Sequence, residues 1–60
     1  MAADLLKPGT AVIISGLKGR PELNGQKGTI GDFNEAKGRY PVRLKSGEAV
    51  LIEMMNLLAI

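Results

Sequence analysis

The 60-residue chain contains no cysteine, no histidine and no tryptophan, and its aromatic residues are one tyrosine and one phenylalanine. Without cysteine no disulfide can form, and without cysteine or histidine the usual zinc sites are excluded. The six acidic residues are scattered along the chain, which argues against a calcium or magnesium site built from carboxylates. We therefore expect no cofactor and no metal site.

The missing residue types and the scarcity of aromatic residues also argue against catalysis and against several kinds of binding site. A nucleophile would have to be Ser15, Ser46, a lysine or a carboxylate, and no such residue has the look of a nucleophile beside its base. A groove for proline-rich peptides, a methyl-lysine cage and a stacking platform for RNA bases each need several exposed aromatic rings. We therefore expect a non-catalytic protein with no small-molecule substrate.

Length and charge set further limits. Sixty residues make one domain at most, and a chain of this size buries only about 60% of its extended-chain surface, so its core is thin. The formal charge of +2 is a mild basic bias. No apolar run is long enough to span a bilayer, and the first seven residues lack the features of a secretory signal. We expect an intracellular protein, in the cytoplasm or in an organelle.

A glycine-rich stretch, Gly16 to Gly31, organises the first half of the chain. It lies between two segments that suit β-strands, residues 10–15 and 26–33, and predicts a long loop joining them. Within it, Leu23 is expected to turn inward, and Asn24-Gly25 is a tight-turn dipeptide. In the stretch from Pro21 to Gly25, backbone conformation or packing accounts for every residue except Glu22, which is free to face a partner.

The second half predicts three more strands. Residues 39–45 alternate, with Tyr40, Val42 and Leu44 on one face, and Pro41 should face an unpaired edge or a bulge because it has no N–H. Residues 48–53 predict a fourth strand with Val50 and Ile52 inward. A 3₁₀ turn at 54–56, with Asn56 bonding nearby backbone, leads into a last strand at 57–60.

Together with Val12, Ile14 and Ile30 on the inner faces of the first two strands, these segments predict an all-β fold. We expect a small five-stranded antiparallel barrel, with a long loop after the first strand and a 3₁₀ turn before the last. Residues 1–8 would form an amino-terminal arm, and residues 9–60 the barrel. Phe33 and Tyr40 are both expected in its core.

These residues carry a family resemblance. The chain reads G-x-x-V-x-I-x-G-L from Gly9, P-E-L-N-G-x-x-G-x-I from Pro21, G-R-Y-x-V-x-L from Gly38, and N-L at Asn56. It resembles small SH3-like barrel modules found in plant, algal and protist proteins beside ankyrin repeats or MYND-type zinc fingers. The core is also similar to a KOW motif. The resemblance implies an SH3-like barrel and a non-catalytic role; Met54 departs from it, since many such modules have a proline there.

Apolar residues in excess of what a thin core can hold indicate a protein-docking surface or self-association. The candidates are Leu5, Leu6, Ile13, Leu51, Met54, Met55, Leu58 and Ile60. The alternative is that the amino-terminal arm folds back and covers Ile13 and Leu51.

A second hypothesis is that the protein contacts RNA as a KOW-like accessory, with its cations against phosphates. The candidates are Lys18, Arg20, Lys27, Arg39, Arg43 and Lys45. Arg39, Arg43 and Lys45 are expected on the outer face of one strand, and Lys18, Arg20 and Lys27 in or beside the long loop. The alternative is that these charges, with Lys37, only keep a small protein soluble.

Overall fold

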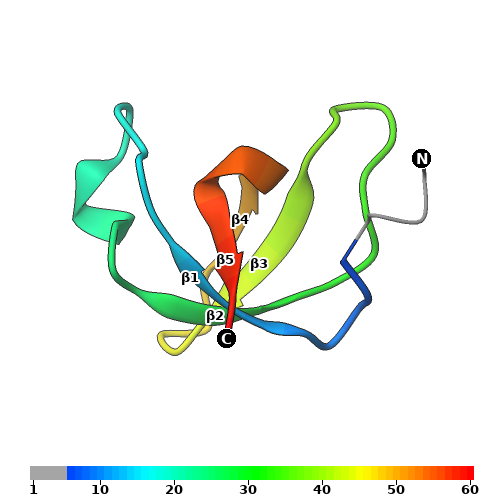
Figure 1. The fold of residues 1–60 in the computed structure, drawn as a ribbon, viewed down its shortest axis with the longest axis horizontal. Helices are drawn as coiled ribbons and strands as arrows, with labels where there is room; N and C mark the ends of the chain where they lie inside the picture. The colour runs from blue at the N-terminus through cyan, green and yellow to red at the C-terminus, as the bar shows by residue number, and fades with distance from the viewer. Residues whose placement is uncertain (1–5) are drawn as a thin grey trace.

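The computed structural model describes residues 6–60, and this part of the chain is all-β (Figure 1). The strands are β1 (Ala11–Ile14), β2 (Lys27–Ile30), β3 (Tyr40–Leu44), β4 (Ala49–Ile52) and β5 (Leu57–Ala59). Two 3₁₀ turns, η2 (Pro21–Leu23) and η3 (Met54–Asn56), lie in the long loop and before β5. The predicted strand order along the chain, the long loop and the last turn are confirmed, with strands one to four residues shorter than predicted.

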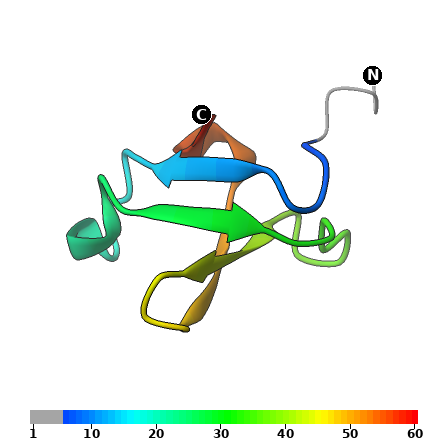
Figure 2. The same cartoon turned by 90° about the horizontal axis from the view of Figure 1, so that it is seen from below.

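All five strands belong to one antiparallel sheet with the order β4-β3-β2-β1-β5. The consecutive strands β4 and β5 therefore lie at opposite edges of the sheet, and η3 connects them. Figure 2 shows that the sheet is strongly bent, since the gold strand β4 runs steeply across the blue β1 and the green β2. This bending allows a single sheet to enclose a core on its inner face.

The core consists of nine buried side chains contributed by all five strands and the long loop. They are Val12, Ile14, Leu23, Ile30, Tyr40, Val42, Leu44, Ile52 and Leu57. Successive side chains of a strand point to opposite faces, which is why β3 alternates between buried and more exposed positions. The predicted inward residues are confirmed, except that Val50 and Phe33 are only half-buried against the core.

Tyr40 is fully buried and connects three parts of the chain. Its hydroxyl oxygen accepts a hydrogen bond of 2.6 Å from the backbone N–H of Leu6, which itself packs against the core. The ring of Phe33 meets the ring of Tyr40 edge-on, with centroids 4.9 Å apart. The expectation that Phe33 lies fully in the core is wrong, because it is half-buried at the margin.

The long loop is held to the core at its middle. Leu23 is buried, and Gln26 N–H donates to the Leu23 carbonyl, closing a turn in which Gly25 has a φ of +88°. Asn24, with φ −62° and ψ 133°, and the positive φ of Gly25 fit a type II turn, which favours glycine at that position. The Asn24 side chain accepts from Leu17 N–H at 2.8 Å and donates to the Leu17 carbonyl at 3.0 Å.

Two local expectations are corrected by the register of β2 and β3. Pro41 faces the end of β2 and not an open edge, since its carbonyl accepts the N–H of Gly31 at 2.8 Å. Proline has no N–H to return a second bond. This accounts for β2 ending at Ile30, three residues before the predicted end at Phe33.

Gly28 of β2 lies so close to β3 that it leaves no room for a side chain. A Cβ at Gly28 would lie 2.6 Å from Val42 Cγ1 and 2.8 Å from the Arg43 carbonyl oxygen. Because the backbone oxygen cannot move aside without disturbing the ladder, Gly28→Ala should destabilise the fold by about 1–3 kcal/mol. For a domain of this size the thermal midpoint should fall by at least roughly 4 °C.

Gly19→Ala is the matched control in the same glycine-rich stretch. Gly19 has no atom of residues 6–60 within 4 Å of its added Cβ and no positive φ. Its midpoint, followed by circular dichroism, should stay within the small range of exposed substitutions, about 0.5 kcal/mol. Equal midpoints for the two variants would contradict the close approach.

Candidate functional site

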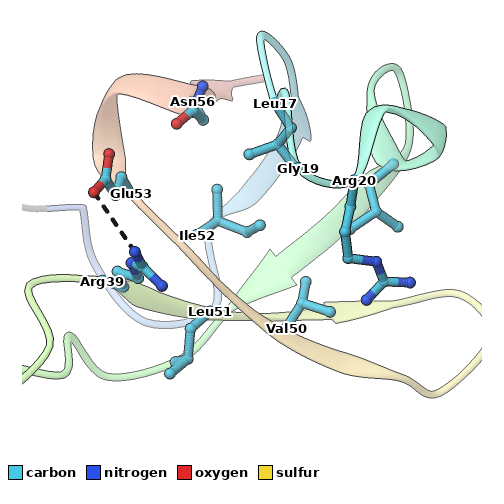
Figure 3. A pocket seen from close by; sticks show the side chains of 10 residues that line it. Leu17, Gly19, Arg20, Arg39, Val50, Leu51, Ile52, Glu53 and Asn56 are labelled. Atoms are coloured by element: carbon cyan, nitrogen blue, oxygen red, sulfur yellow. Dashed lines mark ion pairs between the residues drawn. The ribbon is translucent and has the colours of Figure 1, made fainter.

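A groove of about 510 Å³ lies between the long loop on one side and β4 with η3 on the other (Figure 3). Val50 and Ile52 project from β4 to one side and Leu51 to the other, and Leu17 faces them from the loop. The complete lining is Leu17, Gly19, Arg20, Leu23, Arg39, Val50, Leu51, Ile52, Glu53 and Asn56. The walls are therefore aliphatic, with charged groups at the margin.

The two walls of the groove are joined by a reciprocal pair of hydrogen bonds. Asn56 Nδ2 donates to the Ser15 carbonyl at 2.8 Å, and Ser15 N–H donates to the Asn56 carbonyl at 2.9 Å. The expectation that the Asn56 side chain bonds nearby backbone is thus wrong, since its partner lies 41 residues away in the chain. This contact fixes η3 against the start of the long loop, so the groove is a built feature of the fold.

Ion pairs hold the rim of the groove. Arg20 bonds Glu22 and Glu48, each at 2.9 Å, and so connects the loop to the start of β4. Hydrogen bonding to Glu48, and then to Glu22, raises the pKa of Arg20 above its ordinary value, and the bond from Arg20 lowers the pKa of Glu22. Because all three side chains are largely exposed, these pairs fix the position of the loop more than they stabilise the fold.

The residues that sequence reasoning singled out in the long loop have clear roles here. Leu23, Asn24 and Gly25 are structural, as expected, while Glu22 is engaged by Arg20 within the chain. The lining positions Leu17, Val50 and Asn56 were not recognised as parts of one site. No local pattern marks them, because they meet only through the packing of the loop against β4 and η3.

Of the eight predicted apolar interface residues, four remain exposed. Met54 is 43% exposed, Met55 81%, Leu58 57% and Ile60 61%. Leu6, Ile13 and Leu51 are half-buried, and Leu5 lies outside the described residues. The four exposed side chains all fall within residues 54–60, which we call the docking segment.

Part of the docking segment continues across the sheet. Ile13 of β1 lies directly opposite Leu58 of β5, so both side chains are on the same outer face. Ile60 N–H donates to the Ala11 carbonyl at 3.1 Å, which extends the register by two residues and places Ala11 and Ile60 on that face as well. We call Ala11, Ile13, Leu58 and Ile60 the apolar strip.

The structure divides the six predicted RNA-contacting cations into groups. Arg20 and Arg39 lie at the groove, where Arg20 has its two carboxylate partners and Arg39 lies 3.9 Å from Glu53. The expectation that Arg39 shares a face with Arg43 is corrected, because Arg39 lines the groove and Arg43 does not. Lys18 lies in the long loop and lines neither the groove nor the hollow described next.

The remaining cations, Lys27, Arg43 and Lys45, lie together and are called the basic strip. They line a second hollow of about 310 Å³ with Ala11, Gly28, Thr29, Leu44 and Ile60. Thr29 is opposite Arg43 and Gly28 opposite Leu44, so the strip spans the outer face of β2 and β3. Within residues 6–60, none of these three side chains has a carboxylate within 4 Å.

The chain matches no protein-family model, no curated protein and no solved structure. Over residues 6–60, no group of three or more potential ligating side chains is placed to hold a metal ion. In the same span no helix has the length and apolar character needed to cross a membrane.

The Arg20 network predicts a pH-dependent behaviour of Glu22. Its carboxyl should titrate below the ordinary value of 4.5, because Arg20 donates to its charged form. The depressed pKa favours the folded state above the ordinary pKa, and this contribution is lost as the pH falls through the depressed value. Arg20→Gln should return the Glu22 titration, followed by NMR, towards its ordinary value.

The control is Lys18→Gln, which should leave the Glu22 titration unchanged. It removes a cation from the same loop, and within residues 6–60 this cation makes no ion pair. The assigned ion pair would be contradicted if Glu22 titrated alike with and without Arg20.

Proposed function

We propose that this chain is a non-catalytic protein-interaction module with an SH3-like fold, which serves as a small subunit or docking piece of a larger assembly. The observation that carries the proposal is the docking segment, in which four large apolar side chains stay exposed within seven consecutive residues. Large apolar side chains that stay exposed close together in the chain favour a protein–protein contact site. The absence of histidine and cysteine from the chain supports the non-catalytic role.

The free energy available from burying the exposed apolar side chains supports docking. Full burial of a large apolar side chain is worth about 1.5–3 kcal/mol, so covering the exposed fractions of these four gives several kcal/mol. The whole stability expected of a 60-residue domain is only roughly 3–9 kcal/mol. A contact of this size is therefore substantial for this fold. Met54 and Met55 also suit an adaptable contact, because the methionine side chain is flexible and polarizable.

The groove supports the same function and defines what kind of segment it can accept. Its aliphatic walls suit apolar side chains of an extended chain, and its lining holds no aromatic ring on which prolines could stack. The loop after β1 and the turn before β5 form its two sides, an arrangement that favours the SH3-like resemblance. Asn56 belongs both to the groove and to the docking segment, so one partner can contact both.

Affinity purification with residues 1–60 as bait, from a lysate of the source organism, tests the proposal. We expect a defined protein partner whose recovery falls at least about tenfold for Met55→Lys, because burying a lysine in an apolar contact is costly. Ala36→Lys makes the same charge change at an exposed position of the loop between β2 and β3 and should retain the partner. Equal recovery by both variants, or no retained protein at all, would sink the proposal.

A second candidate function, contact with the RNA backbone, is favoured by the basic strip. Three cations gather on one outer face without a carboxylate partner in residues 6–60, although the chain as a whole carries only +2. Such a cluster suits phosphate groups, and the lack of exposed aromatic stacking rings limits any recognition to the backbone.

A salt series with single-stranded RNA tests this candidate. Three phosphate contacts predict a log–log slope of affinity against salt of about −2, since each contact contributes about −0.7. Lys27→Gln should reduce the slope by about 0.7. Lys37→Gln removes the same charge outside the basic strip and should leave the slope unchanged. Absence of binding at low salt, or equal slopes in the two variants, would remove RNA contact from consideration.

A further inference from the structure

The outer edge of β5 carries backbone groups that face away from the sheet. Ser15 N–H donates to the Asn56 carbonyl and Ile60 N–H to the Ala11 carbonyl, so the even-numbered residues face β1. Alternation then directs the backbone groups of Leu57 and Ala59 away from β1. The Leu57 N–H donates a hydrogen bond to the Met54 carbonyl. Within residues 6–60, the backbone groups left without a partner at this edge are the N–H and carbonyl of Ala59 and the carbonyl of Leu57.

This edge lacks the features with which strand edges are usually protected. Leu57 to Ile60 contain no charge, no proline and no bulge, and both Ala59 and its two neighbours are exposed. The opposite edge, β4, is different. It is flanked by Glu48 and Glu53, which pair with Arg20 and Arg39.

We propose that a second copy of this chain pairs with the β5 edge, antiparallel and two-fold symmetric, with Ala59 opposite Ala59 of the second copy. The free N–H and carbonyl of each Ala59 then exchange two hydrogen bonds, which uses the one donor that the edge offers. In this register Leu58 of each copy faces Ile60 of the other on the outer face, so the two apolar strips become one continuous apolar surface.

The distribution of charge fits a second copy as the occupant. The apolar strip holds no charged residue, so no like charges meet at the two-fold axis. The nearest cation of the basic strip, Lys27, is on β2, two strands from the edge. Five interstrand spacings of about 4.8 Å separate the two Lys27 residues across the paired sheets, well beyond the roughly 8 Å Debye length.

The size of the contact predicts a weak dimer. A standard stable interface buries about 800 Å² per partner, close to one fifth of the 4166 Å² surface of residues 6–60. A three-residue strand with the apolar strip beside it is smaller than that, so we expect a concentration-dependent dimer. This inference rests on the proposed function, because it names one occupant of part of the docking segment.

Sedimentation velocity of residues 1–60, from about 10 μM to about 1 mM, tests the inference, with folding of each variant checked by circular dichroism. The mass should rise from 6.4 kDa towards twice that value. Ala59→Pro removes the single free donor without touching a bond to β1 and should reduce dimerisation at least about tenfold. Leu58→Lys, which places a charge in the strip while keeping every backbone donor, should do the same.

Ala49→Pro is the matched control at the other edge of the sheet. Leu44 N–H donates to the Glu48 carbonyl, so by alternation the N–H of the exposed Ala49 points away from β3. This variant should dimerise as the unchanged chain does. A monomer at every concentration, or a dimer that Ala59→Pro and Leu58→Lys leave intact, would overturn the inference. A monomer that still captures a partner in a Met55-dependent way would overturn the dimer alone and leave the proposed function standing.

Discussion

The structure depends on one constraint, which is that within residues 6–60 a single bent sheet of five short strands buries only eight of its own side chains, with Leu23 of the long loop as the ninth. Because neighbouring residues of a strand point to opposite faces, each side chain on the inner face leaves its neighbours outside. On β1 the core takes Val12 and Ile14, so Ile13 lies on the outer face. On β5 the core takes Leu57, and Leu58 is exposed. The apolar surface that we assign to docking is thus a direct consequence of the geometry that makes the core.

The long loop shows how a small fold builds a binding groove without a large core. Leu23 anchors the loop to the interior, Asn24 ties it to Leu17, and Arg20 ties it to Glu48 before β4. The Asn56–Ser15 contact then brings η3 to the same place. Exposed ion pairs contribute little energy, so the buried leucine and the hydrogen bonds to backbone do most to set the shape of the groove, and the ion pairs of Arg20 help to hold the loop at its rim.

Much of the fold could be predicted because the chain carries strong local signals. Alternation identified the inner face of β3, whereas β1 is apolar throughout and has no such signal, and glycine and asparagine marked the turn at Asn24-Gly25. The predicted end of β2 was wrong because it depends on Pro41, which belongs to another strand. The predicted role of Asn56 was wrong because its hydrogen-bond partner is 41 residues away in the chain. The groove and the basic strip could not be predicted from the sequence for the same reason. Both arise from residues that only the sheet brings together.

Methyl nuclear Overhauser effects in dilute solution test the central claim most directly, because a shift of one residue in strand register would exchange the two faces. We predict contacts among the methyl groups of Val12, Val42 and Leu57 and the ring of Tyr40, with Ile13 close to Leu58 and to none of these four residues. Contacts from Ile13 to Val42 or Tyr40, with Val12 exposed, would contradict the account.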